Sequence, residues 1–277
     1  MGGWRLSLHH ILILAAIQGL TEFLPVSSSG HLVITSKLLG YPDQGLTIDV
    51  ALHVGTLLAV ALYFWRDVWE IAVGGLRLVT GRRGPQVRLL INVIIATIPI
   101  ILAGYFGHPY VVMFARDVQL IAWASIGFGV LLFVADRVGM TVWRVEHLTW
   151  VNALAIGLAQ VLALIPGTSR SGITMTAGRL LGMERWEAGR FSLILSIPTI
   201  FAAGLLTGIE IRLSEDFTLL GPDALASAAA GFVAGFIAIA LMMAWLRRAG
   251  FTPFVVYRLV LGAGLLYWHF NGGNSLI

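Results

Sequence analysis

The stretch Pro166-Gly-Thr-Ser-Arg-Ser-Gly-Ile-Thr174 lies between two apolar segments, and the rest of the chain is organised around it. Its opening proline and glycine end a helix, and Gly172 lets the backbone approach a ligand closely. The guanidinium of Arg170, flanked by hydroxyl groups, can bind phosphate oxygens two at a time. A helix that begins near Ser171 adds free N–H groups that attract an anion. The pattern therefore predicts an anion-binding loop.

An alternative for this loop is a plain connection between helices, with its arginine facing water or lipid headgroups. The chain has 277 residues, of which 58% are hydrophobic and 12% charged, and its mean hydropathy is +0.87. This composition is typical of a polytopic membrane protein, in which a charge at membrane depth is costly and usually functional. Anion binding is therefore favoured. The absence of cysteine excludes disulfides, Cys-ligated zinc and thiol catalysis.

Six apolar runs are long enough, at roughly 17–23 residues, to cross the hydrocarbon core as helices. They are 48–65, 89–106, 118–138, 189–209, 224–246 and 254–270. Two shorter pairs, 11–24 with 31–40 and 150–166 with 172–182, are broken by Pro, Gly and Ser. Such broken pairs are tolerated at membrane depth only when protein or a wet cavity surrounds them, so we interpret them as re-entrant helical hairpins.

The two halves of the chain repeat. A shift of 142 positions superimposes Lys37-Leu-Leu-Gly40 on Arg179-Leu-Leu-Gly182 without a gap. The same shift pairs Gln18 with Gln160, Leu20 with Leu162, Ser27 with Ser169, Ser29 with Ser171 and Gly30 with Gly172. Three spanning helices per half make the second half enter from the opposite face, with both hairpins near the midplane. We therefore predict an all-α polytopic membrane protein with an inverted-topology repeat, one domain over 1–277 and halves of roughly 8–138 and 149–270.

Basic residues set the expected orientation, because cytoplasmic loops are enriched in Lys and Arg. If the loop from Trp65 to Leu89 is cytoplasmic, most arginines share its side. These are Arg66, Arg77, Arg82, Arg83, Arg88, Arg137, Arg144, Arg185, Arg190, Arg247 and Arg248. The opposite side holds two arginines and the acidic residues near 210–223. Both termini are then outside the cytoplasm. The net charge of +4, spread over short loops, fits this bias better than a nucleic-acid surface.

The first hairpin carries a second polar group, Gln18-Gly-Leu-Thr-Glu22-Phe-Leu-Pro-Val-Ser27-Ser-Ser-Gly-His31. Gln18 and Glu22 are four residues apart and share one helix face. A carboxylate, an imidazole, several hydroxyls and the arginine of the other hairpin are the groups needed for acyl or phosphoryl transfer.

Each of these residues has a structural alternative. Glu22 can serve only as the ion-pair partner of Arg170, and His31 can cap the following helix. The serines at 27–29 are good N-cap residues in any protein. His53 we interpret as a packed polar residue or a rim group.

The two motifs together resemble the signature motifs of the bacterial undecaprenyl pyrophosphate phosphatase family, also called the bacitracin-resistance family. The resemblance extends to length, segment order and repeat, and so covers essentially the whole chain. It implies a bacterial inner-membrane enzyme that hydrolyses the C55 polyprenyl pyrophosphate carrier to its monophosphate, which is recycled for peptidoglycan and other envelope polymers. The site is expected to open to the periplasmic face and to use Mg²⁺ or Ca²⁺. The partners are then the lipid substrate and membrane lipids, not nucleic acid, and a homodimer stays open.

Carried over by motif position, the resemblance implies a role for each polar residue of the hairpins. Glu22, Ser28, His31 and Arg170 are expected to be catalytic, with Glu22 also the metal ligand. Substrate contacts are expected from Gln18, Ser27, Ser29, Ser169, Ser171 and Thr174. Position 18 departs from the commonest version of the motif, because it holds Gln where Glu is usual. This puts a metal site with two carboxylates in doubt.

Three questions stay open on the residues alone. The nucleophile can be Ser28 (or Ser27), or a water activated by Glu22 and the metal. A transporter or flippase for a phosphate-bearing lipid also uses inverted repeats and broken helices. It needs no nucleophile and base, so the Glu22 and serine cluster favours the enzyme. An acid-phosphatase type of membrane enzyme has a Ser-Gly-His element too, but its flanking motifs are absent, since no Arg-Pro pair occurs in the chain.

Overall fold

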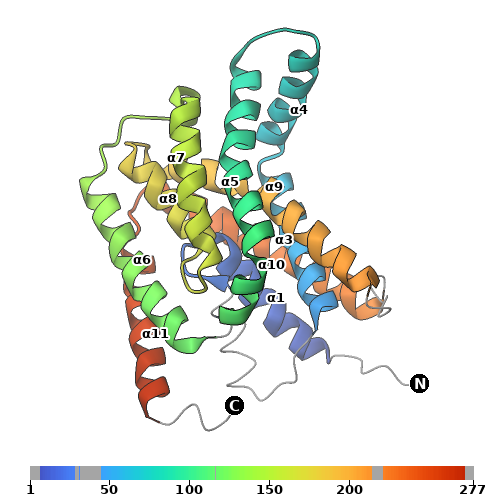
Figure 1. Ribbon diagram of the computed structural model, residues 1–277, viewed down its shortest axis with the longest axis vertical. Coiled ribbons are helices and arrows are strands. Elements are labelled where there is room, and N and C mark those ends of the chain that lie inside the picture. The colour runs from blue at the N-terminus through green and yellow to red at the C-terminus, as the bar shows by residue number, and fades with distance from the viewer. Residues whose placement is uncertain (1–6, 29–30, 32–44, 116, 214–220, 272–277) are drawn as a thin grey trace.

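The computed structural model describes residues 7–28, 31, 45–115, 117–213 and 221–271, and in these residues it is a bundle of helices without a β-strand (Figure 1). The first half contains α1 Leu8–Phe23, α3 Leu46–Tyr63, α4 Trp65–Val79, α5 Pro85–Phe114 and α6 Val118–Val138. The second half contains α7 Trp150–Val161, α8 Arg170–Leu180, α9 Arg185–Leu213, α10 Pro222–Leu246 and α11 Thr252–Phe270.

The prediction of an all-α polytopic membrane protein is confirmed. Five helices, α5, α6, α9, α10 and α11, are long and apolar enough to cross a membrane. The pair α3 and α4, bent by 84° at its break, is long and apolar enough only when its two helices are taken together. Five of the six predicted spans coincide with α5, α6, α9, α10 and α11, and the sixth, 48–65, corresponds to α3.

The expected loop from Trp65 to Leu89 is wrong in its first part, because 65–79 forms helix α4. The charged residues of this segment belong to an amphipathic helix. Gly74 of this helix packs against α5, because a Cβ at this position would lie 2.4 Å from the Gln86 carbonyl oxygen. Asp67, in the first turn of α4, is buried because it pairs with Arg190 of α9, with Nη2 to Oδ1 at 2.6 Å. The tertiary ion pair makes this polar segment an ordered part of the bundle.

The second hairpin is present as α7 and α8. α7 begins at the cap Thr149, whose hydroxyl accepts from the Asn152 N–H at 3.3 Å, and has 12 residues. A 3₁₀ turn at Leu162–Leu164 follows, and α8 has 11 residues. Neither helix is long enough to span a bilayer, as a re-entrant pair requires. In the first hairpin α1 is present, whereas the predicted partner segment 31–40 lies outside the described residues except for His31.

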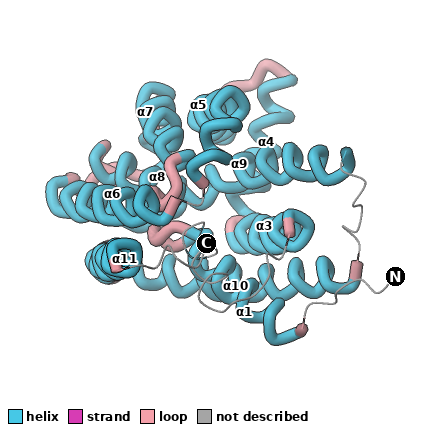
Figure 2. The backbone as a smooth tube through the Cα atoms, turned by 60° about the horizontal axis from the view of Figure 1, so that its bottom comes forward, coloured by secondary structure: helices cyan, strands magenta, loops and turns pink. Residues whose placement is uncertain are grey.

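Three helix pairs pack closely across the bundle. α1 lies against α10, and its counterpart α7 lies against α5, while α6 lies against α11 (Figure 2). α3 also packs closely on α10, because Gly55 lets the two backbones approach: a Cβ there would lie 2.1 Å from the Ala228 carbonyl oxygen. The inverted repeat itself and its boundaries stay a prediction.

Buried ion pairs join the helices at the arginine-rich end. The Asp136 carboxylate of α6 accepts from Arg185 Nε of α9 at 2.7 Å and forms an ion pair with Arg179 of α8, whose Nε lies 3.2 Å from Asp136 Oδ1. Arg190 adds bonds to Glu146 and Glu187 beside its pair with Asp67. This network holds the C-terminal end of α8. Arg170, the first residue of α8, takes no part in it and faces the interior.

Candidate active site

The first hairpin breaks directly after Glu22. α1 ends at Phe23, and Leu24, which precedes Pro25, is extended with φ −69° and ψ 149°. A residue before proline is pushed out of the helical region, so the break follows from the sequence. Because Gln18 and Glu22 are one turn apart on the last turns of α1, their side chains meet, with Gln18 Nε2 donating to Glu22 Oε2 at 3.1 Å.

Both hairpins contain a serine with left-handed backbone. Ser27 has φ 75° and Ser169 has φ 72°, and these two are the only such non-glycine residues in the part of the chain that the structure describes. This conformation costs of order 1–3 kcal/mol and persists only where the surroundings hold it. The next residues, Ser28 and Arg170, are helical. The 142-residue shift therefore places the hydroxyl of Ser28 and the guanidinium of Arg170 at equivalent points of the two hairpins.

The two hairpins meet at Glu22. Arg170 Nη2 donates to Glu22 Oε1 at 3.3 Å, and Ser28 Oγ donates to Glu22 Oε2 at 3.0 Å. The side chains of Glu22 and Arg170 are only 9% and 11% exposed. A buried carboxylate thus faces a buried cation on one oxygen and a hydroxyl on the other. Chemically, this arrangement can provide a base beside a nucleophile and a charge-stabilising group.

His53 of α3 lies beside Gln18 and Glu22 at the edge of the site. Its Nδ1 donates to the Asp49 carbonyl at 2.8 Å, so its Nε2 accepts from Gln18 Nε2 at 3.1 Å. The ring is 36% exposed and its Nε2 is 3.9 Å from Glu22 Oε2. His53 therefore lies at the rim of the site, in agreement with the rim interpretation, and adds a titratable group near the carboxylate.

Three predicted substrate-binding residues of the second hairpin hold Arg170 in place. Ser169 caps α8 by accepting from the Gly172 N–H at 3.2 Å. Ser171 Oγ donates to the Leu24 carbonyl at 2.8 Å and so ties the two breaks together. Thr174 Oγ1 donates to the Arg170 carbonyl at 2.9 Å and shares a 2.6 Å bond with Ser192 Oγ. These contacts position the arginine, and direct contact of the three hydroxyls with substrate stays a prediction.

His31 joins the first hairpin to α11. Its Nδ1 donates to the Ser27 carbonyl at 2.6 Å, and its Nε2 lies 2.5 Å from the Tyr257 hydroxyl, which then donates to it. Its ring stacks on Tyr257 with centroids 5.6 Å apart. Tyr257 was not foreseen from the sequence. Ser29, predicted to bind substrate, lies outside the described residues.

Arg258 is the second residue that the sequence analysis missed. It is fully buried, and its guanidinium donates to the Pro25 carbonyl at 3.3 Å and the Gly167 carbonyl at 3.0 Å, one in each hairpin break. Two more bonds reach the carbonyls of Ala124 and Ser125 in α6. No described carboxylate pairs with it. Arg258 is thus a positioning residue that holds both breaks together, and its place inside the apolar run 254–270 was a signal that could have identified it.

The donor set suits a hard cation shared with a substrate. Among the described residues no three His, Asp or Glu side chains gather tightly enough to hold a metal alone. The Glu22 carboxylate and the Ser28 hydroxyl offer oxygen atoms, and Gln18 Oε1 is a buried oxygen without a hydrogen-bond partner. Mg²⁺ is commonly held by one or two carboxylates together with substrate phosphates. The residues therefore fit an ion completed by phosphate oxygens.

Comparison with known proteins agrees with the motifs. Residues 11–264 match the model of the family described as Bacitracin resistance protein BacA. A protein of Rhodospirillum rubrum named undecaprenyl-diphosphatase 1 is 49% identical over 267 residues, which are 92% of this chain and 93% of that protein. The undecaprenyl-diphosphatase of Roseobacter denitrificans is 49% identical over 96% of this chain and 100% of its own. That of Alteromonas mediterranea is 46% identical with the same coverage.

Proposed function

This chain belongs to the bacitracin resistance protein BacA family, and from that premise we propose how Glu22, Ser28 and Arg170 carry out its activity. The chain is an undecaprenyl-diphosphatase: it hydrolyses undecaprenyl diphosphate to undecaprenyl phosphate and inorganic phosphate. The reaction recycles the lipid carrier for cell-envelope synthesis and accounts for resistance to bacitracin. The observation that supports our mechanism most directly is the pair of contacts at Glu22, to Arg170 and to Ser28.

The serine route fits these contacts best. Ser28 Oγ attacks the terminal phosphorus, and its proton passes to Glu22 Oε2, 3.0 Å away. The bond to the bridging oxygen breaks, and its electron pair leaves on undecaprenyl phosphate. Glu22 passes its proton to the phosphate oxygen of the departing undecaprenyl phosphate and is a carboxylate again. A water then attacks the phosphoserine and gives a proton to Glu22. The bond from phosphorus to Ser28 Oγ breaks, inorganic phosphate leaves, and Glu22 returns the proton to the Ser28 oxygen. In the alternative route Glu22 activates the water directly, and no phosphoserine forms.

Arg170 neutralises the charge that develops on the transferred group. Catalysis of phosphoryl transfer rests mainly on positioning and electrostatic stabilisation. The guanidinium is buried and fixed by its bond to the Ser192 carbonyl at 3.3 Å, so it needs little reorganisation when the phosphate arrives. The free backbone N–H groups at the start of α8 reinforce it.

A divalent cation, Mg²⁺ or Ca²⁺, would be held by Glu22 and Gln18 together with substrate oxygens. When bound it would neutralise phosphate charge and fix the diphosphate in line with Ser28. Glu22 remains the residue that takes the proton in this scheme.

The proposed opening of the site is toward the periplasm. α3 begins at Leu46 and ends at Tyr63, next to the arginine-rich end formed by α4 and its neighbours. His53 lies in the half of α3 away from that end and is the exposed member of the site. Because arginines favour the cytoplasmic side, the exposed rim lies toward the outer face. A homodimer stays a prediction, which the mass of the detergent-purified protein would test.

The test is phosphate release from undecaprenyl diphosphate by the detergent-purified full chain, with and without chelator. We expect release by the unaltered protein and a loss of at least about 100-fold in Arg170→Ala, the size of loss seen on removing one charge-stabilising donor. A folded protein that binds the lipid but releases no phosphate would favour the translocator alternative instead.

A further inference from the structure

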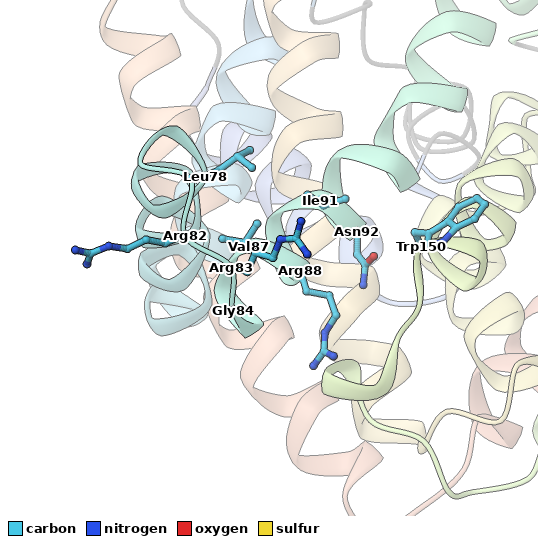
Figure 3. Close-up of a pocket in the computed structure, with 10 residues that line it drawn as sticks. Leu78, Arg82, Arg83, Gly84, Val87, Arg88, Ile91, Asn92 and Trp150 are labelled. Carbon is cyan, nitrogen blue, oxygen red and sulfur yellow. The ribbon is translucent and has the colours of Figure 1, made fainter.

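A pocket lined by arginines lies at the other end of the molecule from the rim of the candidate active site. It has a volume of about 440 Å³ and is formed by the turn between α4 and α5, the first turns of α5 and the start of α7 (Figure 3). Arg83 and Arg88 extend from the turn and from α5 on the side that faces Trp150, whereas Arg82 extends to the opposite side. Leu78, Ile91 and Trp150 give the pocket apolar walls.

The walls of the pocket are firmly built. α4 is held tightly on α5 by the Gly74 contact described above. On the other side, the buried Asn92 side chain donates from Nδ2 to the Leu148 carbonyl at 2.9 Å and so fixes the start of α7, with Trp150, beside α5. The pocket therefore does not depend on a ligand for its shape.

The charge of the pocket is uncompensated. No acidic residue lines it, and neither Arg83 nor Arg88 forms an ion pair with a residue that the structure describes. Neighbouring Arg77 is occupied, because it donates to Gln86 Oε1 at 2.8 Å. Arg190 and Arg185, by contrast, each pair with buried carboxylates. Two guanidinium groups that line one pocket without a carboxylate partner can together bind an anion that presents several oxygens, such as a phosphodiester.

The surroundings select a lipid over a soluble anion. Trp150 is 60% exposed at the start of an apolar helix, where tryptophan marks the membrane interface. Leu78, which also lines the pocket, is 48% exposed. Free phosphate would use the arginines but leave these apolar surfaces in water. Basic pockets between helices on the cytoplasmic side are typical binding sites for acidic lipid headgroups.

We propose that this pocket binds the headgroup of an anionic phospholipid of the cytoplasmic leaflet, with Arg83 and Arg88 holding its phosphate and Trp150 packing on its acyl chains. The site is separate from the substrate site and does not rest on the proposed catalytic roles.

The test compares dioleoyl-phosphatidylglycerol with dioleoyl-phosphatidylcholine, titrated onto the detergent-purified full chain and counted as bound lipid by native mass spectrometry. A basic side chain near an acidic lipid contributes about fivefold in affinity, so the double variant R83Q/R88Q should lose about 25-fold for phosphatidylglycerol and little for phosphatidylcholine. The matched control R137Q/R248Q removes the same charge from exposed arginines at the same end, and should lose little.

Two further measurements distinguish a lipid headgroup from a soluble anion as the ligand. Trp150→Ala should weaken phosphatidylglycerol binding while leaving competition by inorganic phosphate unchanged. If the unaltered protein binds both lipids equally, or the control variant loses as much as R83Q/R88Q, the pocket is not a headgroup site. If inorganic phosphate binds as tightly as the lipid and Trp150→Ala has no effect, the pocket binds a soluble anion and the proposal is overturned. Gel filtration and thermal unfolding of each variant establish that it is folded.

Discussion

Removal of Arg258 should inactivate the enzyme while leaving it folded. The change we consider is Arg258→Met, which keeps most of the volume but none of the four hydrogen bonds to carbonyl oxygens. Bonds from a charged donor contribute roughly 1.5 kcal/mol or more each, so about 6 kcal/mol of stabilisation is lost. Against this, a buried guanidinium without a carboxylate partner costs several kcal/mol in desolvation, and that cost disappears as well.

The two contributions oppose each other, so we expect a net change in stability of about 2 kcal/mol or less. The expected loss of catalytic rate is not offset by any opposing contribution. Pro25 and Gly167 lie in the breaks that carry Ser28 and Arg170, and a displacement of about 1 Å in a reacting group can cost roughly 100-fold in rate. We therefore expect kcat to fall about 100-fold, with a smaller change in KM.

The assay is steady-state phosphate release from undecaprenyl diphosphate, together with thermal unfolding in the same detergent. Arg258→Lys is the matched variant. Lysine keeps the charge, but its compact ammonium cannot reach both breaks. The kcat of Arg258→Lys should therefore lie between that of the unaltered protein and that of Arg258→Met. A folded Arg258→Met protein with kcat within about threefold of the unaltered protein would show that the clamp does not position the site, since the expected loss is about 100-fold.

Three other changes have defined outcomes. Ser28→Ala should lower kcat by at least about 10⁴-fold if the serine is the nucleophile; activity within about tenfold would support the water route. Gln18→Glu puts a second carboxylate within hydrogen-bond reach of Glu22. Two carboxylates this close need a proton or a cation between them. The Mg²⁺ concentration for half-maximal activity should therefore fall. An unchanged Mg²⁺ titration would argue against an ion at this position. Asp67→Asn leaves the buried charge of Arg190 without its main partner and should cost about 3 kcal/mol in thermal unfolding without loss of activity per folded molecule.

The spanning helices and the meeting of the two hairpins were predictable, because their signals are local. Length and apolarity identify a spanning helix, and Pro25 and Pro166 mark the breaks. The pairing of Glu22 with Arg170 followed from the cost of burying either charge alone. The repeat pairs Ser27 with Ser169, and the structure gives both residues a positive φ.

The residues that were missed depend on packing between distant segments. Helix α4 appears polar in the sequence because the partner of Asp67 lies far along the chain, at Arg190. Likewise Tyr257 and Arg258 lie on α11, remote in sequence from both hairpins, and only the packing of α11 on α6 brings them to His31 and the two breaks. Hydroxyls near an anion site could not be divided by sequence into substrate ligands and positioning groups. The bonds of Ser171 and Thr174 to backbone carbonyls show that both hydroxyls also hold the hairpin backbone.

The central claim is that Glu22 and Arg170, one from each hairpin, act as a single catalytic unit. The most direct test is a double-mutant cycle on phosphate release with Glu22→Gln, Arg170→Ala and the double variant, all in detergent with Mg²⁺. Residues that act as a unit are strongly non-additive, so the double variant should be no slower than the slower single variant. Losses that multiply in the double variant would mean that the two residues act independently and would contradict the account.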